Sequence, residues 1–96
     1  MQPRHHRTIV NGLQLRETLR AGPFVWPGGY PLYFVADDGE ALSFESVRAN
    51  IRQVLRSIRD GANDGWRVLG VDVNYEDPAL FCAHSGDRIP SAYSED

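Results

Sequence analysis

The residues best suited to chemistry are Cys82 and His84, in the segment Cys-Ala-His-Ser-Gly-Asp-Arg-Ile that begins at Cys82. This segment has the outline of a zinc knuckle, Cys-x-x-Cys-Gly-x-x-Ile, with Ser85 at the second ligand position. Upstream, Ser43 and Ser46 stand at the cysteine positions of a partner outline. A structural zinc site needs four Cys or His ligands, and serine hydroxyls are poor substitutes. We therefore expect no bound metal and no cofactor, and either a degenerate zinc-ribbon-like scaffold stabilised by core packing or a chance similarity.

Nucleophilic catalysis by Cys82 would need a nearby base and a third group that orients this base. His84 lies two residues away, on the same face of a predicted strand, but the sequence offers no such third group. We interpret Cys82 as a buried, inert residue. The carboxylate pairs 37–38 and 76–77 are adjacent in turns, whereas a general acid and base usually come from separate elements. No glycine-rich nucleotide loop occurs. The sequence therefore predicts a protein that is not an enzyme and has no small-molecule substrate.

Charge divides the chain into a basic start and an acidic body. All ten basic residues are arginine. Residues 1–20 carry four arginines against one glutamate, whereas residues 21–96 carry six arginines against twelve carboxylates. An acidic body works against non-specific binding to a phosphate backbone and suits a basic partner, or simply favours solubility.

Several carboxylates and two aromatic side chains are candidates for contact with such a partner. Alternate residues on one face of a long predicted strand are acidic or polar, and a second acidic group follows another strand. If the sheet brings the two groups together, they form a patch that imitates phosphates. Trp26 would supply an aromatic anchor or, in the alternative, pack against the core. The candidate partner-binding residues are Asp72, Asn74, Glu76, Asp77, Asp37, Asp38, Glu40, Trp26 and Tyr30.

A stripe of arginines supports a competing interpretation. Arg48, Arg52, Arg56 and Arg59 follow helical spacing along the polar side of one predicted helix. Such a stripe could meet nucleic acid or an acidic protein, or be a solvated face balanced by nearby carboxylates.

The N-terminal half predicts short elements around an aromatic loop. Residues 8–10 form a strand and 13–21 a short helix, with a hairpin between 8–10 and 13–15 as the alternative. The loop 24–31 contains two prolines and two glycines. A strand at 32–36, a turn at 37–39 and a brief return at 41–42 follow.

The C-terminal half contains the strongest helical pattern. Apolar residues recur on one helical face from 44 to 59, Ser43 can cap this helix, and Gly61 can end it. Alternation from 66 to 76 predicts a strand with Leu69 and Val71 on one face and Val68 on the other. A last strand begins at 79–82. The fold class is therefore α+β: a small antiparallel sheet of 3–4 strands, one main amphipathic helix packed on one face and a short N-terminal helix.

Length and hydropathy predict one domain over residues 1–96, with residues 1–7 flexible and 94–96 a frayed tail. No apolar run is long enough to span a bilayer, and no signal-peptide pattern follows the first residues. We expect a cytoplasmic protein without a membrane partner.

Four motifs resemble a family of small uncharacterised proteins from phages, plasmids and prophage regions. They are Trp-Pro-Gly-Gly-Tyr-Pro-Leu-Tyr-Phe at 26–34, Asp-Gly-Trp-Arg-Val at 64–68, Asn-Tyr-Glu-Asp at 74–77 and Ser-Ala-Tyr at 91–93. The resemblance covers roughly residues 15–93. It implies that relatives carry cysteines at the positions of Ser43, Ser46 and Ser85 and are true zinc ribbons.

An origin in mobile elements implies an inhibitor of host defence, such as an anti-CRISPR protein. We hypothesise that the acidic patch acts as a DNA mimic and occupies a basic, nucleic-acid-binding surface of a host protein, such as a CRISPR effector subunit. The alternative is a nucleic-acid-binding module that uses the arginine stripe on a degenerate zinc-ribbon scaffold. A third class is an assembly protein that only self-associates.

Overall fold

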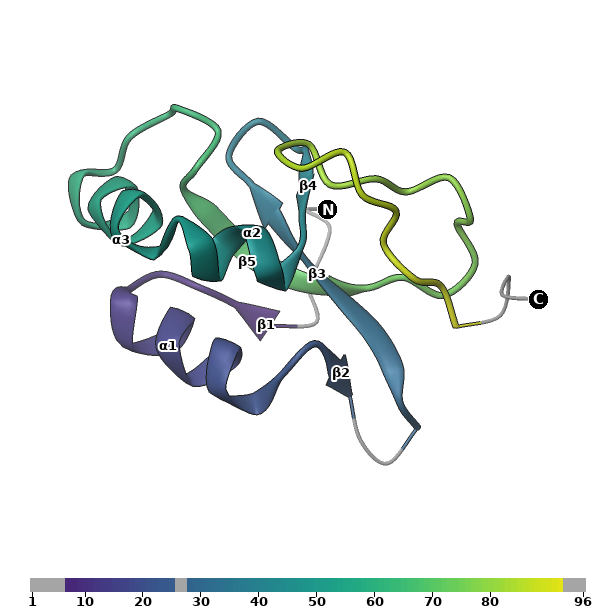
Figure 1. Cartoon of the computed structure of the whole chain (residues 1–96). Coiled ribbons are helices and arrows are strands. Elements are labelled where there is room, and N and C mark those ends of the chain that lie inside the picture. Colours follow the sequence, from purple (N-terminus) through teal and green to yellow (C-terminus); the bar gives the residue numbers. More distant parts are fainter. Residues whose placement is uncertain (1–6, 26–27, 93–96) are drawn as a thin grey trace, which may run out of the picture.

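The computed structural model describes residues 7–25 and 28–92, which form an α+β fold (Figure 1). The strands form a five-stranded antiparallel sheet in the order β1-β5-β3-β2, with β4 also paired to β3. Figure 1 shows the helices on one side of β3 and the C-terminal segment on the other. The elements are β1 Arg7–Thr8, α1 Gly12–Ala21, β2 Phe24–Val25, β3 Tyr30–Ala36, β4 Ala41–Leu42, α2 Phe44–Ala49, α3 Ile51–Asp60 and β5 Val68–Val73.

Helix α1 confirms the predicted N-terminal helix and rules out the hairpin alternative. The side chain of Asn11 caps it by accepting from the backbone N–H of Gln14 at 2.9 Å. Gly22 ends the helix with a φ of 94°, which favours glycine, and its N–H donates to the carbonyl of Thr18. Leu15 and Leu19, four residues apart, both lie in the core.

The predicted continuous helix over 44–59 is wrong, because two helices, α2 and α3, meet at Asn50. The residue has φ −118° and ψ 31°, outside helical geometry. Its side-chain amide donates to the carbonyl of Ser46 at 2.8 Å, the same carbonyl that its backbone N–H uses. Asparagine competes in this way with the helical backbone pattern, which explains the break. The predicted ends are confirmed: Ser43 caps α2, and Gly61 ends α3 in the left-handed region.

Strand β5 is shorter than the predicted 66–76 and contains an irregularity in its pairing with β3. Val35 pairs with Gly70, but Ala36 pairs with Val68, so Leu69 is an extra residue. Because a bulge shifts the alternation of side chains, Val68 and Val71 both become fully buried. The predicted placement of these two valines on opposite faces is therefore wrong.

The expected last strand at 79–82 is a narrow turn instead. Phe81 forms only an isolated bridge with Arg88. The turn begins at Cys82, whose carbonyl accepts from the N–H of Gly86, and the N–H of Ala83 donates to the carbonyl of Ala41 beside β4. The C-terminal segment thus packs against the β4–α2 junction.

The core forms between the helices, the sheet and this C-terminal turn. Phe34 from β3 and Phe44 from α2 pack with ring centroids 4.4 Å apart. The largest fully buried side chains among the described residues are Phe34, Leu15, Val47, Val54, Val68, Val71, Cys82, Ser57 and Ser91. Among the described residues, no helix has the length and apolar character needed to cross a membrane.

Candidate functional site

An acidic and aromatic surface forms where β5 ends beside the start of β3. Tyr33 and Asp72 are direct cross-strand neighbours, so their side chains share a sheet face. Burial raises the pKa of the Tyr33 hydroxyl, and the charges of Asp72 and Asp77 raise it further. Both carboxylates therefore lie close enough to act on one hydroxyl. We call the set Tyr33, Asp72, Tyr75, Glu76 and Asp77 the acidic end.

Two tyrosine rings, those of Tyr30 and Tyr75, pack against each other at the acidic end. The rings of Tyr30 and Tyr75 meet edge to face with centroids 5.6 Å apart. Tyr75 is 52% exposed, an unusual position for a large aromatic side chain. Sequence analysis proposed Tyr30 but missed Tyr33 and Tyr75. The signal for Tyr33 was its register opposite Asp72, which only the strand pairing defines.

Asn74 holds the acidic end in place from inside the protein. The residue is buried, and its amide nitrogen donates to the carbonyls of Asp77, Ile89 and Pro90 at 3.0–3.3 Å. Its amide oxygen accepts from the backbone N–H of Asp77 at 3.1 Å. These bonds occupy the side chain of Asn74, so it is poorly placed for the predicted contact with a partner, which stays a prediction. Asn74 instead links the turn that carries Glu76 and Asp77 to the C-terminal segment.

The second predicted acidic group lies at the opposite end of the β3–β5 pairing. Asp37, Asp38 and Glu40 follow Ala36, whereas the acidic end lies beside Leu32. Leu32 and Ala36 are separated by roughly 13 Å along an extended strand. The two groups therefore do not form the single patch that the hypothesis required.

Residues of this second group stabilise local turns. One carboxylate oxygen of Asp37 accepts from the backbone N–H groups of Gly65 and Arg67, at 3.0 and 3.2 Å. Asp38 accepts from the N–H of Glu40 at 3.0 Å. Trp26, the predicted anchor, lies outside the described residues.

The predicted arginine stripe is interrupted by the break at Asn50. Arg48 lies on α2 and donates to the carbonyl of Leu19, near the end of α1. Arg59 pairs with Asp60 at 2.9 Å. Arg52 and Arg56 are exposed on α3. The four arginines therefore lie on two helices.

Residues from both predicted knuckle outlines lie around the sulfur of Cys82. The backbone N–H of Ser43 donates to Cys82 Sγ at 3.3 Å, and Sγ lies 3.3 Å from Ser46 Oγ. Ser85 also bonds to the sulfur through its side chain and its backbone. We call Ser43, Ser46, Cys82 and Ser85 the serine–cysteine cluster.

The cluster changes the ionisation of its cysteine. Burial raises the pKa of the Cys82 thiol, but the hydrogen bonds from Ser46, Ser85 and the Ser43 backbone together lower it to about 6. In the thiol form the S–H donates to Ser46 Oγ, and in the thiolate form the hydroxyl donates to sulfur. The interpretation of Cys82 as buried is confirmed.

The side chains of His84 and Cys82 do not share a face. Because residues 82–86 form a turn rather than a strand, Cys82 points inward while His84 is exposed. The His84 ring instead meets Trp66 edge to face with centroids 4.9 Å apart, and its Nε2 lies 3.4 Å from Asn50 Nδ2. Among residues 7–25 and 28–92, no three His, Cys, Asp or Glu side chains gather as metal ligands.

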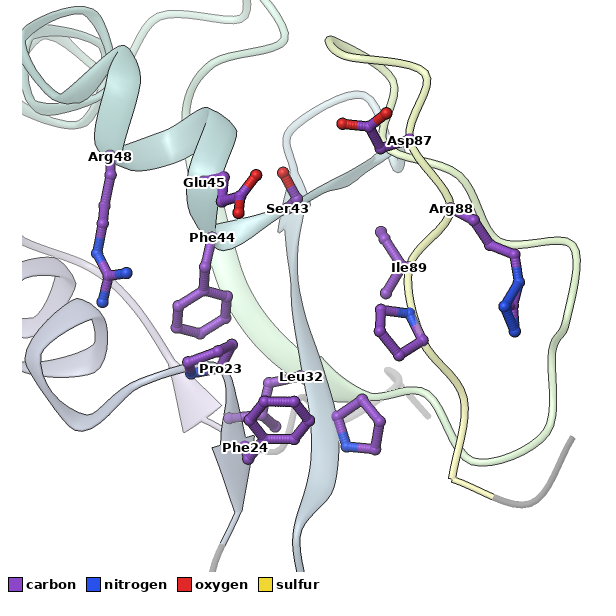
Figure 2. A pocket seen from close by; sticks show the side chains of 12 residues that line it. Pro23, Phe24, Leu32, Ser43, Phe44, Glu45, Arg48, Asp87, Arg88 and Ile89 are labelled. Atoms are coloured by element: carbon purple, nitrogen blue, oxygen red, sulfur yellow. The ribbon is translucent and has the colours of Figure 1, made fainter. Parts of the chain in front are cut away.

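Sequence analysis also missed a groove of about 350 Å³ between the β2–β3 hairpin, the first turn of α2 and residues 87–90 (Figure 2). Its walls come from three separate segments, 23–32, 43–48 and 87–90, and no local pattern links them. The lining residues are Pro23, Phe24, Pro31, Leu32, Ser43, Phe44, Glu45, Arg48, Asp87, Arg88, Ile89 and Pro90.

Comparisons with known proteins define no family for this chain. No protein-family model matches it, and no solved structure matches it. An alanine racemase from Methylobacterium sp. (strain 4-46) is 34% identical over 87 residues, which cover 80% of this chain. The chain spans only 23% of the length of that racemase.

Proposed function

We propose that this chain is a non-enzymatic binding protein whose acidic end occupies a basic, nucleic-acid-binding surface of another protein. The observation that supports this proposal best is that Asp72 faces Tyr33 across the β3–β5 pairing and that the charge of Asp77, two residues after the exposed Tyr75, also acts on the Tyr33 hydroxyl. Carboxylates arranged around aromatic side chains suit a surface rich in arginine and lysine, because they combine charge complementarity with anchoring area.

The proposal includes the role expected from the sequence, an inhibitor of host defence that resembles anti-CRISPR proteins. The net charge of −3 favours this role over binding to a phosphate backbone. The arginines of α2 and α3 support direct nucleic-acid binding less well, because they lie on two helices separated by the break at Asn50. The racemase match adds no activity to the proposal, since most of that enzyme has no counterpart here.

A capture experiment with charge variants tests the proposal. The chain serves as bait in lysate of a candidate host, with and without nuclease and at low and moderate salt. In the test variant Asp72→Arg, Glu76→Arg and Asp77→Asn are combined. Asparagine at position 77 preserves the side-chain oxygen that accepts from the N–H of Ala79. We expect a nuclease-resistant protein partner that this variant loses, with at least tenfold lower recovery.

The matched control combines Glu17→Arg, Glu40→Arg and Asp60→Asn, which changes the net charge by the same amount at exposed positions elsewhere. It should retain the partner, and circular dichroism should show both variants folded. Retention of the partner by the folded test variant would contradict the proposal. Recovery of nucleic acid, with proteins lost after nuclease treatment, would support the arginine interpretation instead.

A further inference from the structure

The groove has an apolar interior of a size that suits a single large side chain. Phe24 and Phe44 form one wall, and Leu32 and Ile89 complete the interior (Figure 2). Phe24 is 39% exposed although it is aromatic, so part of this interior faces solvent. A volume of about 350 Å³ is near the lower limit for ligand pockets in proteins.

Two acidic and two basic side chains line the groove, so its own charge is balanced. Glu45 and Asp87 lie toward one end of it, on either side of Ser43 in the view of Figure 2. The two arginines bond to backbone carbonyls and keep their positive charge. Arg48 donates to the carbonyl of Leu19, and Arg88, which points away in Figure 2, donates to the carbonyl of Pro78. A preference for a cationic occupant therefore comes from the neighbouring acidic end and not from the rim itself.

The groove and the acidic end are neighbours. The backbone N–H of Asn74 donates to the carbonyl of Pro31, and its amide nitrogen donates to the carbonyls of Ile89 and Pro90. These three residues line the groove, and Asn74 also fixes the turn that carries Glu76 and Asp77. A chain segment that leaves the groove past Pro31 or Pro90 thus meets the acidic end.

We infer that the groove binds one apolar side chain from an extended, arginine- or lysine-rich segment of the partner protein. The apolar side chain enters between Phe24, Phe44 and Ile89, and basic residues of the same segment face the acidic end beside the groove. This inference rests on the proposed function and adds the chemistry of the segment that is recognised. An anchor flanked by complementary charges is the usual arrangement of a strong contact.

Peptide binding to the full chain tests the inference. The probe is a short capped peptide with two arginines on each side of a central tryptophan. A comparison peptide has glycine in place of the tryptophan. Calorimetry at low salt should show roughly tenfold weaker binding of the glycine peptide. The tryptophan peptide should also shift the NMR signals of the Ile89 methyl groups.

Two variants distinguish the contribution of the groove to binding from that of the charged residues. Phe24→Ala removes part of the groove wall. It should lower the affinity for the tryptophan peptide to that for the glycine peptide. Phe81→Ala is the matched control, because Phe81 is 52% exposed and does not line the groove. Equal affinity of Phe24→Ala and the unmodified chain, or equal affinity of the two peptides, would overturn the inference.

The failure of this inference is distinguishable from the failure of the proposed function. If the Asp72, Glu76 and Asp77 variant loses the partner while Phe24→Ala keeps both partner and peptide, the function stands and the groove is not part of it. If the charge variant keeps the partner, the proposed function itself fails, whatever the peptides show.

Discussion

At the scale of single residues, hydrogen bonds determine what the polar side chains do. Asp37 and Asp72 are both carboxylates that follow or lie in a strand. Asp37 accepts two backbone N–H groups and shapes a turn, whereas Asp72 faces Tyr33 on the sheet. Asn74, two residues after Asp72, is enclosed by its own four bonds. Residue type alone did not distinguish these roles.

The lowered pKa of Cys82 predicts that the stability of the fold depends on pH. Its folded pKa, about 6, lies below the ordinary value of 9.0. The folded chain therefore releases this proton at lower pH than the unfolded chain does. The stabilisation is full above about pH 9 and is lost as the pH falls through about 6.

The measurement is urea unfolding of the natural chain and of Cys82→Ser, near pH 5 and near pH 9. We expect the stability difference between them to grow with pH by on the order of 1–3 kcal/mol. Cys82→Ser serves as the reference because it has no thiol to titrate in this range. A difference that is constant with pH would contradict the lowered pKa.

At the scale of elements, short-range signals positioned the turns that meet at Cys82. Ser43 caps α2 and also directs its N–H at the sulfur, so one residue both starts a helix and completes the cluster. The turn from Cys82 to Gly86 places Ser85 on the same sulfur. The two segments lie about forty residues apart in the chain, and the contact of Ala83 with Ala41 joins them.

This convergence predicts that the serine–cysteine cluster becomes a metal site when its serines are replaced. We expect the combination Ser43→Cys, Ser46→Cys and Ser85→Cys to bind one zinc ion through four thiolates, because the backbone of Ser43 and the side chains of Ser46 and Ser85 already contact the sulfur of Cys82. Metal content and the absorption of a cobalt-substituted sample check stoichiometry and tetrahedral geometry. A variant with Ser91→Cys in place of Ser46→Cys should bind more weakly. Failure of the folded triple variant to bind zinc would show that the cluster only resembles a knuckle pair.

At the scale of the whole molecule, the register of β3 and β5 separates the carboxylates into two groups at opposite ends. The groove lies beside the acidic end and shares Pro31, Ile89 and Pro90 with the bonds of Asn74. A partner that covers the acidic end and the groove therefore need not reach Asp38 or Glu40.

This separation predicts that the two ends act independently. The combination Asp38→Asn and Glu40→Arg should leave partner capture within about twofold of the natural chain, because distant sites contribute additively. The same substitutions combined with the acidic-end variant should add nothing to its loss. Quantitative capture at one salt concentration measures both effects. A large loss on changing Asp38 and Glu40 alone would indicate that the partner contacts both ends.

The sequence by itself determined the features that depend on neighbours along the chain. The fold class, the N-terminal helix, the cap at Ser43 and the end at Gly61 followed from periodicity and capping chemistry, which act over a few residues. The two knuckle outlines were also visible, because the spacing within each outline is local.

Only the tertiary structure decided the features that depend on contacts between distant segments. The extra residue at Leu69 arises from pairing with β3, and the groove joins residues 23–32 to residues 87–90. The burial of Asn74 depends on the carbonyls of Ile89 and Pro90. Such contacts are selected by the packing of the whole chain, because a buried polar group is stable only where its partners meet it. Local sequence therefore indicated which residues carry charge, and long-range packing determined which of them share a surface.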